Sequence, residues 1–187
     1  MNASNARVVT VLAVCTMVLA TLALMALNQG PVTIGGHAPL MELAIGDDLA
    51  ADRALSQSDP HRYEVAQRLS ERALARYPYD TSALLRLAFI SRARSDRLGP
   101  DGVAALRRSY AALPFDHYVA FWRIRFALEN WAELPPDLKE AVRREEAAVE
   151  SQPGHRDNLR ETLAAVPPGP GGLVAGFWIA RLDRGRP

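Results

Sequence analysis

Residues 102–114, GVAALRRSYAALP, carry a pattern that occurs twice more in the chain, in residues 66–78 (AQRLSERALARYP) and residues 141–153 (AVRREEAAVESQP). In each stretch, three positions stand at offsets 0, 4 and 7, and a proline follows at offset 12. Such offsets place side chains on one face of an α-helix, and a proline cannot continue that helix. No stretch shows sustained alternation of apolar and polar residues, so we expect an all-α fold without a sheet.

The repeated positions are Ala66, Ser70, Ala73 and Pro78, then Gly102, Leu106, Ser109 and Pro114, then Ala141, Glu145, Ala148 and Pro153. They resemble the second helix of the tetratricopeptide repeat (TPR), which has small residues where paired helices cross. The prolines lie 36 and 39 residues apart, against a period of about 34 in that family. The resemblance covers residues 47–166 and implies a short solenoid of degenerate helical hairpins. An irregular helical bundle is the alternative.

Several residues depart from the family pattern. Glu145 stands where a large apolar residue is usual, and Arg123 falls where a core leucine is expected. Glu145 and Glu146 follow two arginines directly, which favours a solvated helix face with local ion pairs.

Stacked hairpins of the TPR family leave a concave groove lined by their first helices. Arginines beside aromatic residues are typical of protein-binding surfaces, and this composition occurs on two of the expected first helices. Core packing is the alternative role for the aromatic residues. The resulting partner-binding candidates are Phe89, Arg92, Tyr118, Trp122 and Arg125.

Residues 8–27 are twenty consecutive residues without a charge, proline or glycine. A helix of this length spans about 30 Å, the thickness of the hydrocarbon core of a bilayer. Arg7 precedes the run and no lysine or arginine follows until Arg53, which favours an N-in, C-out orientation. We expect residues 1–27 to be an uncleaved transmembrane signal anchor. A cleaved secretory signal and a lipoprotein signal with lipidated Cys15 are the alternatives.

Residues 28–39 (NQGPVTIGGHAP) are rich in glycine and proline and are expected to be a linker. Residues 40–166 form the expected helical domain. Residues 167–187 begin with a Pro/Gly spacer and continue as an amphipathic segment that contains Trp178 and three arginines. That segment has three possible roles: a capping helix, an interfacial segment with Trp178 and the arginines at lipid headgroups, or a partner-binding tail.

Composition excludes several function classes. The net charge of +1, from 22 basic and 21 acidic residues, is unsuited to nucleic-acid binding, which needs a positive surplus. A single cysteine excludes an internal disulfide framework and a cysteine-based zinc site. The four histidines are scattered, and no hydrolase or metalloprotease motif occurs. We therefore expect no enzymatic activity, no cofactor and no metal.

The sequence predicts a bacterial single-pass protein of the cytoplasmic (inner) membrane, whose TPR-like domain faces the periplasm and binds protein partners of the cell envelope. The residues around Arg108-Ser109-Tyr110 and Trp122–Phe126 also resemble small anchored helical proteins of bacterial surface-polysaccharide assembly. The alternative function is an accessory subunit of an integral membrane complex, held through its transmembrane helix.

Overall fold

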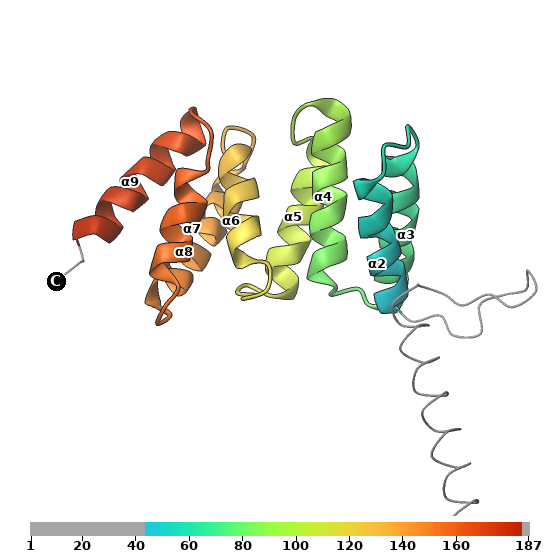
Figure 1. Cartoon of the computed structure of the whole chain (residues 1–187), viewed down its shortest axis with the longest axis horizontal. Helices are drawn as coiled ribbons and strands as arrows, with labels where there is room; N and C mark the ends of the chain where they lie inside the picture. The colour runs from blue at the N-terminus through green and yellow to red at the C-terminus, as the bar shows by residue number, and fades with distance from the viewer. Residues whose placement is uncertain (1–43, 185–187) are drawn as a thin grey trace, which may run out of the picture. The chain divides into compact units, whose positions relative to one another are not determined.

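A computed structural model describes residues 44–184, and the regular structure of these residues is entirely helical (Figure 1). The all-α prediction is confirmed for this part of the chain. The expected anchor (1–27) and linker (28–39) lie outside it. The helices are α2 (Ala44–Ser56), α3 (Arg62–Arg76), α4 (Thr81–Ser95), α5 (Pro100–Ala112), α6 (Ala120–Glu129), α7 (Pro136–Ser151), α8 (Arg156–Ala164) and α9 (Pro170–Arg184).

Among residues 44–184, none of the helices combines the length and the apolar character that crossing a membrane requires.

The described residues divide into two compact units between Arg76 and Tyr77. The first unit contains α2 and α3, and the second contains α4 to α9. The helical domain expected over residues 40–166 is thus split at this point, and its expected C-terminal boundary falls within the second unit.

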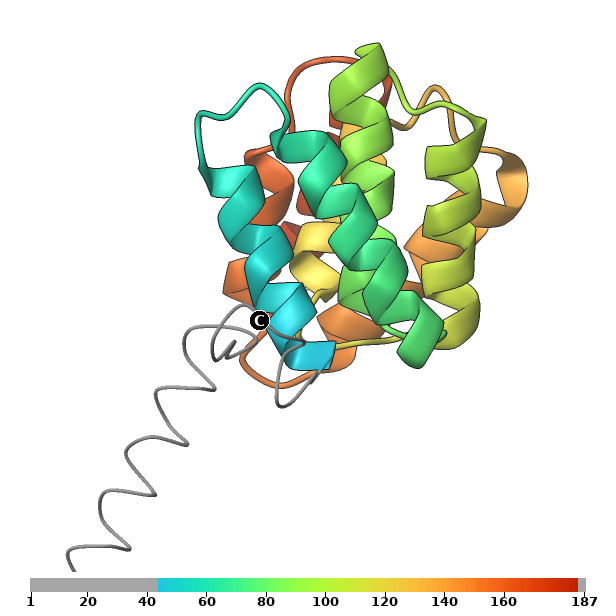
Figure 2. The ribbon, with the colours of Figure 1, turned by 90° about the vertical axis from the view of Figure 1, so that its right-hand side faces the viewer.

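In the first unit, α2 and α3 lie side by side as a hairpin (Figure 2). The small residues Ala66 and Ala73 of α3 are buried. Buried Ser70 donates a hydrogen bond to the carbonyl of Ala66 over 2.8 Å, so its hydroxyl remains satisfied. The carboxylate of Asp47 on α2 is also buried and pairs with Arg76 of α3.

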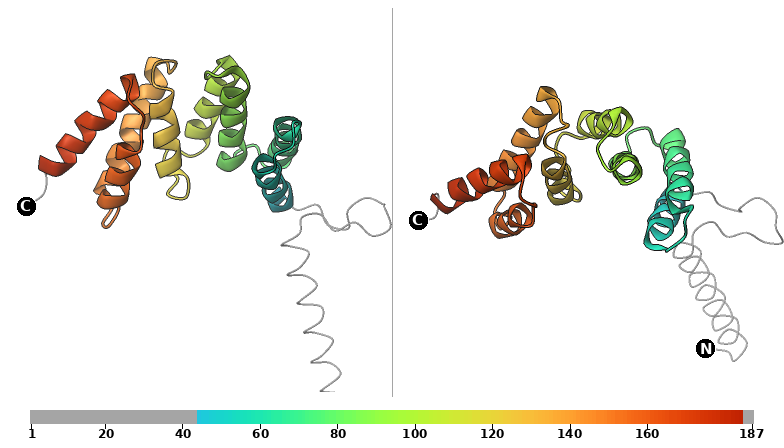
Figure 3. Two further views of the ribbon diagram at one scale, coloured as in Figure 1. Left: turned by 45° about the horizontal axis from the view of Figure 1, so that its top comes forward. Right: turned by 90° about the horizontal axis from the view of Figure 1, so that it is seen from above.

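In the second unit, local capping fixes the helix starts. Asp80 accepts a hydrogen bond from the N–H of Ala83 over 3.1 Å and caps α4. Pro100 and Pro136 occupy the first turns of α5 and α7, where a missing N–H costs nothing. Helices α4 and α5 pack as one pair and α8 and α9 as another (Figure 3), while α6 contacts α7, α8 and α9.

Two glycines mark close helix approaches. A Cβ on Gly102 of α5 would lie 2.5 Å from the side chain of Leu98 and 2.9 Å from the hydroxyl of Ser91 on α4. A Cβ on Gly171 of α9 would collide with the backbone carbonyl of Leu128 on α6. Only glycine therefore fits at either position without moving a neighbouring group.

Helix α9 begins inside the stretch that the sequence analysis assigned to a spacer. Its first turn contains Pro170, which suits a helix start, and the N–H of Leu173 donates to the carbonyl of Gly169 over 2.9 Å. The helix also carries the repeated offsets 0, 4 and 7, at Gly171, Ala175 and Trp178, all of them buried. Helices α8 and α9 therefore form a further hairpin that shares the three helical offsets, with Asp183 in place of the proline at offset 12. The expected spacer is shorter than its Pro/Gly run, because α9 begins at Pro170.

The C-terminal segment packs onto the helices before it. Trp178 is buried, whereas a segment at lipid headgroups would need it at the surface. Its ring packs edge to face against Trp131, with 6.3 Å between the ring centroids. Arg181 reaches Glu146 of α7 at 2.6 Å. The opposite face of α9 exposes Leu173 and Phe177.

We expect Trp178→Ala to lower the free energy of unfolding by about 3–5 kcal/mol, because a large aromatic side chain leaves the core. Phe177→Ala on the exposed face is the matched control and should change it by less than about 0.5 kcal/mol. Chemical denaturation followed by circular dichroism measures both values. Equal effects would contradict the docking of α9 through Trp178.

Candidate functional site: a cleft between α5 and α7

A fully buried ion pair joins α6 to α7. The Arg123 side chain is 0% exposed and the Glu145 side chain is 0% exposed. The Nε of Arg123 donates to both carboxylate oxygens of Glu145 over 3.0 Å, and its Nη2 donates to Oε1. Such bidentate pairing is the strongest arrangement available to arginine and a carboxylate.

The same guanidinium also holds the end of α5. Its Nη1 donates to the carbonyls of Ser109 and Leu113 over 3.2 and 3.1 Å, and its Nη2 donates to the carbonyl of Pro114 over 3.2 Å. The carbonyls of Leu113 and Pro114 lie beyond the last residue of α5, where the helix offers no further N–H, and the carbonyl of Ser109 also accepts from the N–H of Leu113 over 3.1 Å. Arg123 therefore fixes the end of one hairpin against both helices of the next.

Tyr110 of α5 completes the network. Its hydroxyl donates to Oε2 of Glu145 over 2.8 Å, and the guanidinium carbon of Arg123 lies over its ring, 4.1 Å from the ring centroid. Burial, followed by the nearby Glu145 charge, raises the pKa of Tyr110 well above 10. The phenol consequently stays protonated and keeps its role as donor.

The interpretation of Glu145 and Glu146 as a solvated face was wrong, because each residue is only 1% exposed. Glu145 is neutralised by Arg123 from α6, and Glu146 by Arg181 from α9. Burial is the largest influence on both carboxyl groups, and it raises the pKa of each above its ordinary value in spite of the arginines.

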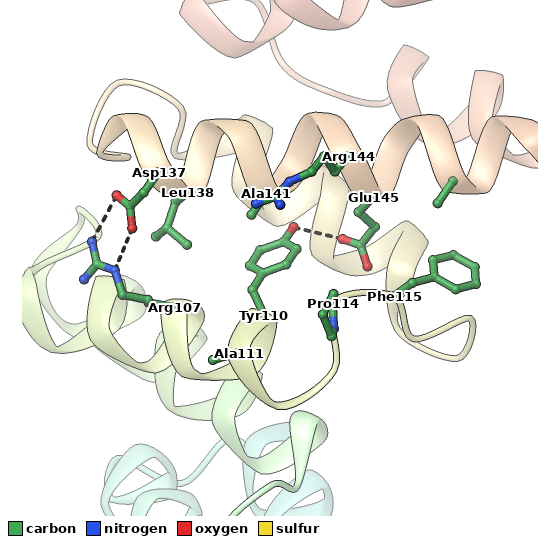
Figure 4. Close-up of a pocket in the computed structure, with 11 residues that line it drawn as sticks. Arg107, Tyr110, Ala111, Pro114, Phe115, Asp137, Leu138, Ala141, Arg144 and Glu145 are labelled. Atoms are coloured by element: carbon green, nitrogen blue, oxygen red, sulfur yellow. Dashed lines mark hydrogen bonds and ion pairs between the residues drawn. The ribbon is translucent and has the colours of Figure 1, made fainter.

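Above this network lies a cleft of about 450 Å³ between α5 and α7. Figure 4 shows Tyr110 reaching from α5 toward Glu145, with Arg107 and Asp137 at one end of the cleft and Pro114 and Phe115 toward the other. The remaining lining residues are Ala111, Leu138, Ala141, Arg144 and Ala148.

The cleft exists because both helices present small side chains to it. Ala141 and Ala148 are only partly buried and line the cleft. They stand at two repeated positions that were expected to be tight helix crossings. Ala111 contributes a third short side chain from α5. The volume lies within the range of about 300–1,000 Å³ that is usual for binding pockets.

An ion pair closes one end of the cleft. Nε of Arg107 donates to Asp137 over 2.8 Å and a terminal nitrogen donates over 3.2 Å. The hydrogen bond from Arg107 lowers the pKa of the Asp137 carboxyl below its usual value. Arg144 lies on the α7 side of the cleft and is exposed (Figure 4). Within residues 44–184, no carboxylate pairs with Arg144.

The five partner-binding candidates from the sequence lie elsewhere, on α4 and at α6. Phe89 and Trp122 are 37% and 44% exposed, and Tyr118 is 86% exposed. Their interactions lie within their own segments: Arg92 pairs with Asp96, Arg125 pairs with Glu129, and Trp122 stacks on Phe126. None of the five lines the cleft.

The polar groups at the floor of the cleft bond to one another. The Tyr110 hydroxyl and the Glu145 carboxylate are committed to each other and to Arg123, so neither is poised to take a proton from a ligand. No group of three or more metal-ligating side chains occurs within residues 44–184.

Comparison with known proteins finds no matching family model, no matching curated protein and no matching solved structure.

We expect Arg123→Met to lower the free energy of unfolding by about 3–5 kcal/mol, because Glu145 would remain buried without its cation. Arg125→Met, two residues along α6, removes an exposed ion pair and should cost only about 0.3–0.5 kcal/mol. Urea denaturation of the two variants provides the test. A similar decrease in the free energy of unfolding for both variants would show that the buried pair contributes no more to stability than the exposed one.

The stability difference between the parent and Glu145→Gln should depend on pH. The folded-state pKa of Glu145 is raised above 4.5, so its contribution to stability is greatest below that pH and declines as pH rises through the folded-state value. The parent should therefore gain stability over the variant as the pH falls from about 8 to about 4, below the ordinary pKa of a glutamate. Urea midpoints at the two pH values measure this, and an opposite trend would mean that Arg123 outweighs burial.

Proposed function

We propose that this chain is a membrane-anchored, non-enzymatic adaptor that binds proteins of the bacterial cell envelope through its helical hairpins. Residues 8–27 would hold it in the cytoplasmic membrane, with the helices in the periplasm. On the resemblance around Arg108-Ser109-Tyr110, its partners would belong to cell-surface polysaccharide assembly.

The observation that supports protein binding best is the cleft between α5 and α7. Its walls are helices whose positions are fixed by the Arg123–Glu145 pair, so little ordering is needed when a partner enters. Its length along α7, from Asp137 to Ala148, corresponds to about 16 Å at 1.5 Å per residue. About five residues of an extended segment would fit along it.

An adaptor anchored in the membrane would need only a modest affinity for its partners. A protein confined to the membrane meets partners in that membrane at a raised effective concentration. The repeat-like hairpins support this role, because stacked hairpins present fixed surfaces to other proteins.

Photo-crosslinking in cells tests the proposal. A benzoylphenylalanine introduced at Ala111, which lines the cleft, should yield a defined adduct with an envelope protein. The same residue introduced at Ala164, which is exposed on α8 away from the cleft, is the matched control and should yield none. Adducts at neither position, or identical adducts at both, would contradict a binding role for the cleft.

A further inference from the structure

Exposed aromatic side chains gather at one end of α4, α5 and α6. The loop before α4 carries Tyr77 and Tyr79, which are 60% and 79% exposed. The loop between α5 and α6 carries Leu113 and Tyr118, which are also exposed. Figure 1 shows both loops at the lower ends of these helices. These four residues are called the tyrosine edge below.

A buried hydrogen bond joins the two loops behind the tyrosine edge. The hydroxyl of Thr81, the first residue of α4, donates to the carboxylate of Asp116 over 2.7 Å, and both residues are buried. Asp116 also accepts from the N–H of Tyr118 over 3.1 Å. The polar groups beneath the edge therefore have partners inside the protein, while the rings of the tyrosines stay exposed.

The opposite end of the same helices has a different surface. Leu98 in the turn between α4 and α5 is buried, and so are Trp131 and Leu134 between α6 and α7. Asp96 and Glu133 are exposed in these turns. The loops at one end thus expose aromatic rings, whereas the turns at the other end expose charged groups.

The chain that leaves the proposed anchor arrives beside the tyrosine edge. Residues 28–43 separate the anchor from α2 and can span at most about 55 Å when extended. Asp47, in the first turn of α2, pairs with Arg76, the last residue of α3, and Tyr77 follows directly. The linker therefore joins the α2–α3 hairpin at the same end from which the chain continues to Tyr77.

We propose that the tyrosine edge rests on the outer surface of the cytoplasmic membrane, with the rings of Tyr79 and Tyr118 among the lipid headgroups. Tyrosine suits this layer because its ring is apolar and its hydroxyl is polar, and it is enriched where membrane proteins meet the water interface. The position of the linker makes a lipid surface the occupant closest at hand along the chain.

This inference rests on the proposed membrane anchoring and adds an orientation of the second unit to it. The cleft between α5 and α7 would stand upright on the membrane. Its end at Phe115 faces the bilayer, and its end at Asp137, in the first turn of α7, faces away from it. A partner segment would therefore enter from the side that is remote from the lipids.

Fluorescence quenching tests the contact with the full chain in nanodiscs of phosphatidylethanolamine and phosphatidylglycerol. In a Cys15→Ser background, a fluorophore is attached to His117→Cys at the edge or to Ala132→Cys beyond the other end of α6, both of them exposed positions. Because α6 separates the labels by about 15 Å or more, lipids with a nitroxide on the headgroup should quench the first label about threefold more strongly. Equal quenching at the two positions would overturn the proposal.

A pair of double variants assigns the contact to the tyrosines. Tyr79→Ser/Tyr118→Ser should lower the quenching at His117→Cys to the level at Ala132→Cys. Leu173→Ser/Phe177→Ser removes two similarly exposed side chains from α9 and should leave the quenching unchanged. All four side chains are exposed, so thermal melting should show each variant folded. Equal effects of the two double variants would remove the tyrosine edge from the account.

The same samples separate this inference from the proposed function. Failure of the full chain to co-elute with nanodiscs would refute the anchoring, and this inference with it. Co-elution with equal quenching would leave the anchoring standing and refute only the contact. In cells, a benzoylphenylalanine in place of Tyr118 should form adducts with lipid, and an adduct with a protein instead would assign the edge to a protein partner and overturn the proposal.

Discussion

A single buried guanidinium, that of Arg123, links three helices and one loop. Arg123 projects from α6 and pairs with Glu145 of α7. It also donates hydrogen bonds to the carbonyls of Ser109 and Leu113 at the end of α5. Burying two charges costs desolvation free energy. The hydrogen bonds that the other polar atoms of the guanidinium make help to offset this cost. The arrangement therefore specifies one geometry of α5, α6 and α7 and excludes sliding of one hairpin against the next.

The cleft is a consequence of that fixed geometry. Arg123 and Tyr110 hold Glu145 in the floor of the cleft, while Ala111, Ala141 and Ala148 leave the space above it open. Larger residues at these three positions would close the gap with side chains and remove the cavity. Arg123 itself lies outside the lining of the cleft, whereas its partners Tyr110 and Glu145 belong both to the network and to the lining.

The helices themselves follow from local sequence. The positions of Pro78, Pro114 and Pro153 predicted the ends of α3, α5 and α7. Helix α9 was not predicted at its observed start, because Pro170 and two glycines are typical of a spacer when they are considered without tertiary contacts. Gly171 is needed there for the close approach to Leu128, which only the folded structure reveals.

The site was less predictable for a similar reason. Arg123 and Glu145 were each identified as charges at expected core positions, but their opposite signs were not combined into a pair. Two oppositely charged residues at core positions of neighbouring helices are a usable signal for a buried ion pair. The cleft depends on the separation of α5 and α7, which the repeat pattern alone does not determine.

Native-state hydrogen exchange tests the linking role of Arg123 most directly. If this residue joins the hairpins, the slowest-exchanging amides of α5, α6 and α7 should open with one common free energy, and Arg123→Met should lower the protection of all three helices together. A result in which α5 exchanges independently of α6 and α7, and keeps its protection in Arg123→Met, would contradict the account.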